Sequence, residues 1–131
     1  MGQDRIFPGF DIGLVIKWTK SNRKDFKMEI RSEKAGDRTI AYVLGEIDHH
    51  NAKRAREILD GIIEKQSQVT FGLDLSGVTF CDSSGLGLVM GRMKKCASVG
   101  STLSVMNPSP AAQKILEIAG MDKILKIERG N

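Results

Sequence analysis

The chain has 131 residues, of which 40% are hydrophobic and 27% charged, and its formal net charge is +4. This length favours one domain with its own core, and no apolar run approaches the roughly 20 residues that span a bilayer, so no membrane segment is expected. Residues 1–24 hold five basic and two acidic side chains, whereas residues 25–131 hold 15 and 14. Because no basic stripe is interleaved with aromatic residues, direct nucleic-acid binding is not expected.

An N-terminal extension, residues 1–24, precedes a domain that we place at residues 25–131. Apolar residues alternate within this extension in the period-two pattern of a strand, at Phe10, Ile12, Leu14, Ile16 and Trp18. The extension either adds a strand to a sheet edge, in the same molecule or in a second copy to give a homodimer, or is a flexible arm. Thr19 to Asp25 indicates a polar linker.

The two cysteines, Cys81 and Cys96, occur without a recognisable secretory signal. Two thiols in such a chain suit a reducing compartment better than a disulfide framework, so a cytoplasmic location is expected. Both are expected to pack as small apolar groups.

A hairpin is predicted at the start of the domain. Phe26–Arg31 and Thr39–Leu44 have the composition of strands, and Ser32–Arg38 is the expected loop between them. After the loop Gly45–His50, an amphipathic helix should end near Gln66. Its expected buried side is Ala52, Ala55, Leu59, Ile62 and Ile63.

Strands alternate with helices in the rest of the chain. A strand at Val69–Leu75 and a short connection lead to Val78–Phe80, and the helix that follows should run to about Ala97. Its expected buried side is Leu86, Val89, Met90, Met93 and Ala97. Then come a strand at Ser101–Met106, a helix capped by Ser109 and stopped by Gly120, and a terminal strand at Lys123–Ile127.

This order of elements predicts an α/β fold. We expect a mixed sheet of four to five strands, with a further N-terminal strand in one alternative, packed against about three helices. Helices that follow consecutive parallel strands begin at the same edge of the sheet. The loop Glu46–His50 and the loop Asp82–Ser84 should therefore be neighbours.

The second of these loops is a strand-to-helix junction with a distinct chemical character. Asp82, Ser83 and Ser84 are good N-cap residues, and a hydroxyl at a helix N-terminus can also carry a phosphate. Gly85 and Gly87 permit close approach of a backbone or a ligand. The plainest alternative is that Asp82, Ser83 and Ser84 only cap the helix and that the glycines only pack it against the sheet.

Two catalytic alternatives for the junction are weak. A nucleophile elbow needs Gly-x-Ser-x-Gly, and neither serine has a glycine two residues before it. A dinucleotide fingerprint needs Gly-x-Gly-x-x-Gly, but Gly85, Gly87 and Gly91 have one residue too many before the third glycine.

Both loops together resemble a known family. Gly45-Glu-Ile-Asp-His-His50, then a helix, then a strand ending in Asp82-Ser-Ser-Gly-Leu-Gly-x-x-x-Gly-Arg92, is similar to the STAS domain of anti-sigma factor antagonists, especially those of sporulation. The resemblance extends from about Asp25 to Glu128. It implies a signalling module without catalysis of its own, which regulates transcription through a sigma factor by partner switching.

The resemblance also implies site residues and partners. An anti-sigma factor serine kinase would phosphorylate Ser83; the unmodified protein would bind that kinase and free the sigma factor, and the phosphorylated form would release it. A PP2C-type phosphatase would restore the unmodified form. Asp48 would lie beside the serine and face basic residues of the kinase. The expected partner-binding set is Asp48, His49, Asp82, Ser83, Ser84 and Gly85.

Several alternatives stay open for individual residues and for the whole chain. Ser84 is expected to cap the helix rather than to be a second phosphorylation site. His49 and His50 could pair with the carboxylates of Asp48 or Asp82. Two adjacent histidines without a third ligand do not predict a metal site. No cofactor and no catalytic residue is expected. The alternative functions are a STAS scaffold, an accessory subunit of a transport system, or a small hydrolase or nucleotide-binding enzyme.

Overall fold

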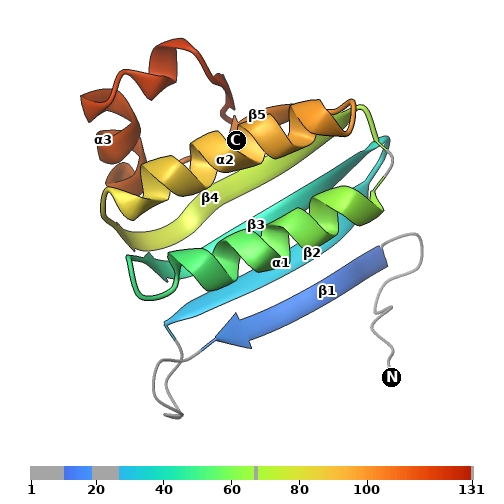
Figure 1. Ribbon diagram of the computed structural model, residues 1–131, viewed down its shortest axis with the longest axis horizontal. Helices are drawn as coiled ribbons and strands as arrows, with labels where there is room; N and C mark the ends of the chain where they lie inside the picture. The colour runs from blue at the N-terminus through green and yellow to red at the C-terminus, as the bar shows by residue number, and fades with distance from the viewer. Residues whose placement is uncertain (1–10, 19–26, 67, 131) are drawn as a thin grey trace.

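The computed structural model describes residues 11–18, 27–66 and 68–130, so the predicted linker Thr19–Asp25 and the residue Phe26 lie outside the described part. One sheet of six strands has the order β1-β2-β3-β4-β5-β6 (Figure 1). The strands are β1 (Asp11–Trp18), β2 (Met28–Ala35), β3 (Arg38–Ile47), β4 (Thr70–Cys81), β5 (Thr102–Met106) and β6 (Lys126–Glu128). The helices are α1 (Ala52–Lys65), α2 (Ser84–Ser98), α3 (Pro110–Ile118) and the short 3-10 helix η2 (Met121–Lys123).

The mixed α/β fold with three α-helices is the one that the sequence predicts. Strands β1, β2 and β3 are antiparallel neighbours, and β3, β4, β5 and β6 are parallel neighbours. Helices α1 and α2 lie side by side across one face of the sheet (Figure 1). None of the helices in the described ranges combines the length and the apolarity that a membrane crossing requires.

The N-terminal strand β1 pairs with β2 of the same chain, from Asp11 opposite Lys34 to Trp18 opposite Met28. It thereby covers an edge of the sheet that β2 would otherwise present, and unpaired edges favour association between chains. Homodimer formation through residues 1–24 stays a prediction.

The prediction of a loop at Ser32–Arg38 is wrong, because β2 continues to Ala35. Ser32 is buried and pairs with Ala41 of β3, and Ala35 pairs with Arg38. Only Gly36 and Asp37 remain for the turn, and Gly36 has a φ of 66°, which favours glycine. Four consecutive polar residues, Arg31 to Lys34, made this part of the strand look like a loop.

The predicted break near Ser76 is also wrong, because β4 is one strand of 12 residues. Its pairing with β3 shifts between Tyr42 and Leu44, and again between Gly45 and Glu46. Each shift places an extra residue in β4, as a β-bulge does. The Asp74 carboxylate accepts hydrogen bonds from the backbone N–H and hydroxyl of Ser76, at 2.9 and 2.6 Å, which stabilises the first irregularity.

The buried side of α2 differs from the expected one. Val89 is buried as predicted, but Met90 and Ala97 are exposed. The buried residues are Gly85, Leu88, Val89, Arg92 and Cys96. Arg92 is 5% exposed, and its Nε lies 3.0 Å from Oδ1 of Asp60 on α1. The pattern failed because a glycine and a paired arginine occupy positions that a hydrophobicity count assigns to the surface.

The C-terminal helix follows its sequence signals, but the last strand is shorter than expected. The hydroxyl of Ser109 accepts a hydrogen bond from the Ala112 N–H at 3.2 Å, and Gly120, with a φ of 71°, follows the C-cap of α3 and separates this helix from η2. Residues Met121–Lys123 form η2, so the strand predicted at Lys123–Ile127 is reduced to Lys126–Glu128.

A bidentate ion pair ties β6 to β3. The Arg38 guanidinium donates to both carboxylate oxygens of Glu128, at 2.9 and 3.0 Å, and the Ser104 hydroxyl donates to the same carboxylate at 2.6 Å. These hydrogen bonds, first that of Arg38, lower the pKa of Glu128 from 4.5 to about 2. The folded state therefore gains stability from ionised Glu128 at a pH above 4.5, and this gain is lost as the pH falls toward 2.

We expect Glu128→Gln to lower the melting temperature at pH 7, with a difference from wild type that persists to about pH 4.5 and disappears near pH 2. Calorimetric melting curves of both proteins across this range provide the measurement. Glu57→Gln, which removes an exposed carboxylate beside Arg54, is the control for loss of a surface charge. A Glu128→Gln difference that is constant with pH would contradict the assigned role of the ion pair.

Candidate functional site

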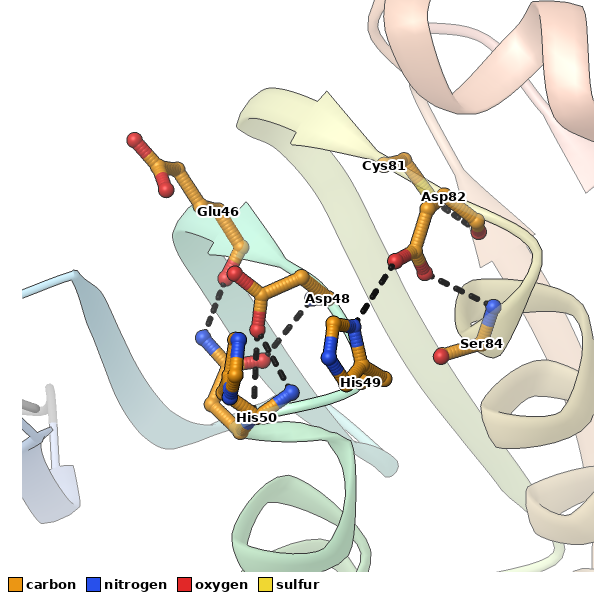
Figure 2. Close-up of polar contacts among 8 residues, drawn as sticks. Glu46, Asp48, His49, His50, Cys81, Asp82 and Ser84 are labelled. Carbon is orange, nitrogen blue, oxygen red and sulfur yellow. Dashed lines mark hydrogen bonds and ion pairs between the residues drawn. The ribbon is translucent and has the colours of Figure 1, made fainter.

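The two loops singled out by the sequence lie together where β3 and β4 end. The Asp82 N–H donates to the Ile47 carbonyl at 3.1 Å, and Nδ1 of His49 lies 3.9 Å from Oδ2 of Asp82. Figure 2 shows His49 between the loops, with its ring directed at Asp82. The prediction that these loops are neighbours is confirmed, and we call residues Glu46–Asn51 and Asp82–Gly85 the rim site.

In the first loop, Asp48 is held by reciprocal hydrogen bonds at the start of α1. Its Oδ1 accepts from the N–H groups of His50 and Asn51, at 2.9 and 3.2 Å. In return, Oδ1 of Asn51 accepts from the Asp48 N–H at 3.0 Å. This is the pattern of a capping box, in which two side chains satisfy each other's backbone donors. It caps the turn that leads into α1, where the Ala52 N–H donates to the Asp48 carbonyl at 2.9 Å; Asn51, directly before the regular helix, makes no side-chain cap bond to it. Asp48 itself is half-buried, so part of its carboxylate reaches solvent.

In the second loop, the cap of α2 is Asp82 and not Ser84. Oδ1 of Asp82 accepts from the Ser84 N–H at 2.8 Å (Figure 2). Ser84 is the first residue of the helix, and Ser83, at the N-cap position, makes no capping bond with its side chain. The expectation that Ser84 caps the helix is therefore wrong, because the carboxylate two residues earlier reaches its backbone first.

Ser83 is the exposed hydroxyl of the site. The N–H groups that follow it are already engaged: Gly85 donates to the Asp82 carbonyl at 2.9 Å and Leu86 donates to the Ser83 carbonyl at 3.1 Å. A negative group on Ser83 would thus meet the Asp82 carboxylate and find the first amides of α2 in use. This hydroxyl is accessible for chemistry. A negative group on it would be favoured by the helix dipole of α2 and opposed by the nearby Asp82 carboxylate.

Gly85 permits close contact between α2 and β4. A Cβ at this position would lie 2.3 Å from Sγ of Cys81, well inside contact distance. Cys81 and Cys96 are free thiols, and burial raises the pKa of each to about 11, so both remain protonated near neutral pH. They pack as small apolar groups, as the sequence predicts.

The two histidines lie on the exposed side of the rim site. Their ring centroids are 3.9 Å apart, with an angle of 39° between the rings. Both side chains are exposed. Within residues 11–18, 27–66 and 68–130, no group of three or more histidine, cysteine and acidic side chains is placed to hold a metal ion.

Asn51 is the site residue that the sequence reasoning missed. It is fully buried, and its Nδ2 donates to the Glu46 carbonyl at 2.7 Å. The sequence signal was an acidic residue, Asp48, followed three positions later by an amide, which is a variant of the capping-box spacing.

Comparisons with known proteins find matches to both the sequence and the fold. The STAS domain family matches residues 29–130. The anti-sigma F factor antagonist of Lysinibacillus sphaericus is 34% identical over 82 residues, which are 63% of this chain and 70% of that protein. The solved structure of the anti-sigma factor antagonist SpoIIAA in its unphosphorylated form has a TM-score of 0.65 at 26% identity, covering 78% of this chain and 88% of that one.

The Bacillus cell fate determinant SpoIIAA has also been solved in the phosphorylated form. It aligns with a TM-score of 0.59 at 26% identity, covering 78% of this chain and 91% of that one. The resemblance inferred from the two loop motifs is confirmed: the chain belongs to the STAS domain family, alongside proteins named anti-sigma factor antagonists.

Proposed function

We propose that this protein is an anti-sigma factor antagonist that acts in the cytoplasm by partner switching. In its unmodified form it binds an anti-sigma factor serine kinase at the rim site, and the kinase then releases its sigma factor. The kinase phosphorylates Ser83, which ends the binding, and a PP2C-type phosphatase restores the unmodified form. The relatives named anti-sigma factor antagonists support the class of function.

The observation that carries the proposal is the position of Ser83. Its hydroxyl is exposed, and it lies in sequence and space beside Asp82, across the rim from the loop of Asp48. A phosphoryl acceptor must reach into a nucleotide pocket, which an exposed hydroxyl at a helix start can do. The related protein SpoIIAA has been solved in an unphosphorylated and in a phosphorylated form, which supports the proposal that this protein is phosphorylated.

Charge explains why the modification would switch binding. A phosphate adds about 1.5 to 2 negative charges at neutral pH. On the free protein water surrounds this group, whereas in a complex it would lie close to Asp82 and to the phosphates of the kinase's nucleotide. Like charges then face each other with little water between them, and the complex is weakened.

The test is phosphorylation by an anti-sigma factor serine kinase. We expect incubation with that kinase and ATP to add one phosphate, located at Ser83 by peptide mass spectrometry. Ser84 is the internal comparison, because it is adjacent but half-buried at the first position of α2. A phosphate on Ser84, or none with a kinase that binds the protein, would overturn the assignment.

A further inference from the structure

Asn51 is a buried polar residue that serves a loop rather than the core. Its side chain is 0% exposed. Both of its polar atoms are used: Nδ2 donates to the Glu46 carbonyl at 2.7 Å, and Oδ1 accepts from the Asp48 N–H at 3.0 Å. A single amide therefore connects the end of β3 with the turn that precedes α1.

The bonds fix one side of the Asp48 carboxylate. Its Oδ1 accepts from the His50 and Asn51 N–H groups, whereas Oδ2 has no hydrogen-bond partner among the described residues. The backbone of Asp48 is held by Asn51 in turn. The carboxylate thus has one oxygen tied to the loop and one oxygen available to a partner.

An ordinary helix cap would need less than this. Capping the turn that leads into α1 requires only an oxygen that accepts from its N–H groups, and Asp48 supplies it for His50 and Asn51. The bond from Asn51 back to the Glu46 carbonyl lies upstream of the cap and adds nothing to it. Its effect is to close the loop on both sides of Asp48, which limits the directions in which the free oxygen can point.

We propose that Asn51 is a positioning residue for partner binding: it holds the Asp48 carboxylate in the orientation that the anti-sigma factor kinase recognises. This inference rests on the proposed function. Asn51 is buried and does not touch the kinase, so it acts only through Asp48. A group that is already oriented loses less freedom when it binds, and this preorganisation increases affinity.

The test is a double-mutant cycle in the full chain, with the serine kinase that phosphorylates Ser83, in its ADP-bound form, as the probe. We expect Asn51→Ala to weaken binding about tenfold in titration calorimetry, because the carboxylate is no longer held. In the Asp48→Asn background the same change should weaken binding less than about twofold, since no charge remains to be oriented. In steady-state phosphorylation of Asn51→Ala, KM should rise with kcat unchanged.

Two further measurements separate positioning from general loss of structure. Ser101→Ala removes a buried hydroxyl that donates to the Val69 carbonyl at 3.0 Å. This bond lies where β4 and β5 begin, at the opposite end of the parallel strands from the rim site. Ser101→Ala should change kinase affinity less than about twofold. Amide exchange should be faster at Asp48 in Asn51→Ala and unchanged inside α1. Should Asn51→Ala fail to fold, Asn51→Ser, which is too short to reach both partners, replaces it in the same cycle.

The outcomes are distinct. A wild-type chain that does not bind the kinase overturns the proposed function itself. Wild-type binding together with equal affinity of a folded Asn51 variant overturns only the positioning role. An equal loss of affinity in both backgrounds also overturns it, because Asn51 would then act independently of Asp48.

Discussion

Phosphorylation of Ser83 should weaken binding to the anti-sigma factor kinase by about 100-fold. The hydroxyl is exposed at the N-cap of α2, next to the Asp82 carboxylate that caps the helix. The first N–H groups of α2 are engaged within the loop, so the protein offers few donors to a phosphate there. A repulsion of about 3 kcal/mol in the complex corresponds to about two orders of magnitude in the dissociation constant.

The measurement is the affinity of the protein for the ADP-bound kinase before and after stoichiometric phosphorylation. Ser83→Ala, treated identically with ATP, should bind as the unmodified protein does, within a few fold. Ser84→Ala is the matched control, since it retains the backbone N–H that Asp82 caps and leaves Ser83 free to be modified. If phosphorylated and unmodified proteins bound equally tightly, the switch would not reside in this hydroxyl.

The sequence predicted the architecture well because alternation of strands and helices is a strong signal. Prediction from the sequence failed where a single residue interrupts the hydrophobic pattern of a strand or a helix. Gly77 in β4 suggested the end of a strand, yet a Cβ there would lie 2.9 Å from Cγ of Leu44, so the glycine permits close packing at the irregular pairing instead. In α2, burial of Arg92 is possible only because Asp60 of another helix lies opposite, and a single-segment pattern cannot include that partner.

The rim site was predictable in its location and not in its hydrogen bonds. Because β3 and β4 are parallel neighbours, their C-terminal ends lie at the same end of the sheet, which places the loop of Asp48 near Asp82. Which side chain caps each helix depends on distances of a few tenths of an ångström. Asp82 instead of Ser84 caps α2, and Asn51 instead of a glutamate completes the box at α1. These choices decide which oxygens remain free for a partner.

Replacing Asp48 by asparagine should weaken kinase binding by about 10- to 100-fold while leaving the fold almost unchanged. Asparagine retains an oxygen that can accept from the His50 and Asn51 N–H groups, so the cap at α1 is kept. The negative charge that would face basic residues of the kinase is lost. Removal of one partner from a desolvated charge pair costs about 2 kcal/mol or more. Titration calorimetry gives the affinity, and a thermal melt gives the stability.

Asp48→Ala provides the contrast, because alanine removes both the charge and the cap. We expect the same weakening of kinase binding together with a loss of about 1 kcal/mol in the free energy of unfolding. In a domain of this size that corresponds to a melting temperature lower by about 4 °C. The difference in the free energy of unfolding between the two variants thus measures the contribution of the cap. The loss of kinase affinity that they share measures the contribution of the charge. Wild-type affinity in Asp48→Asn would place the charge of Asp48 outside the contact with the kinase.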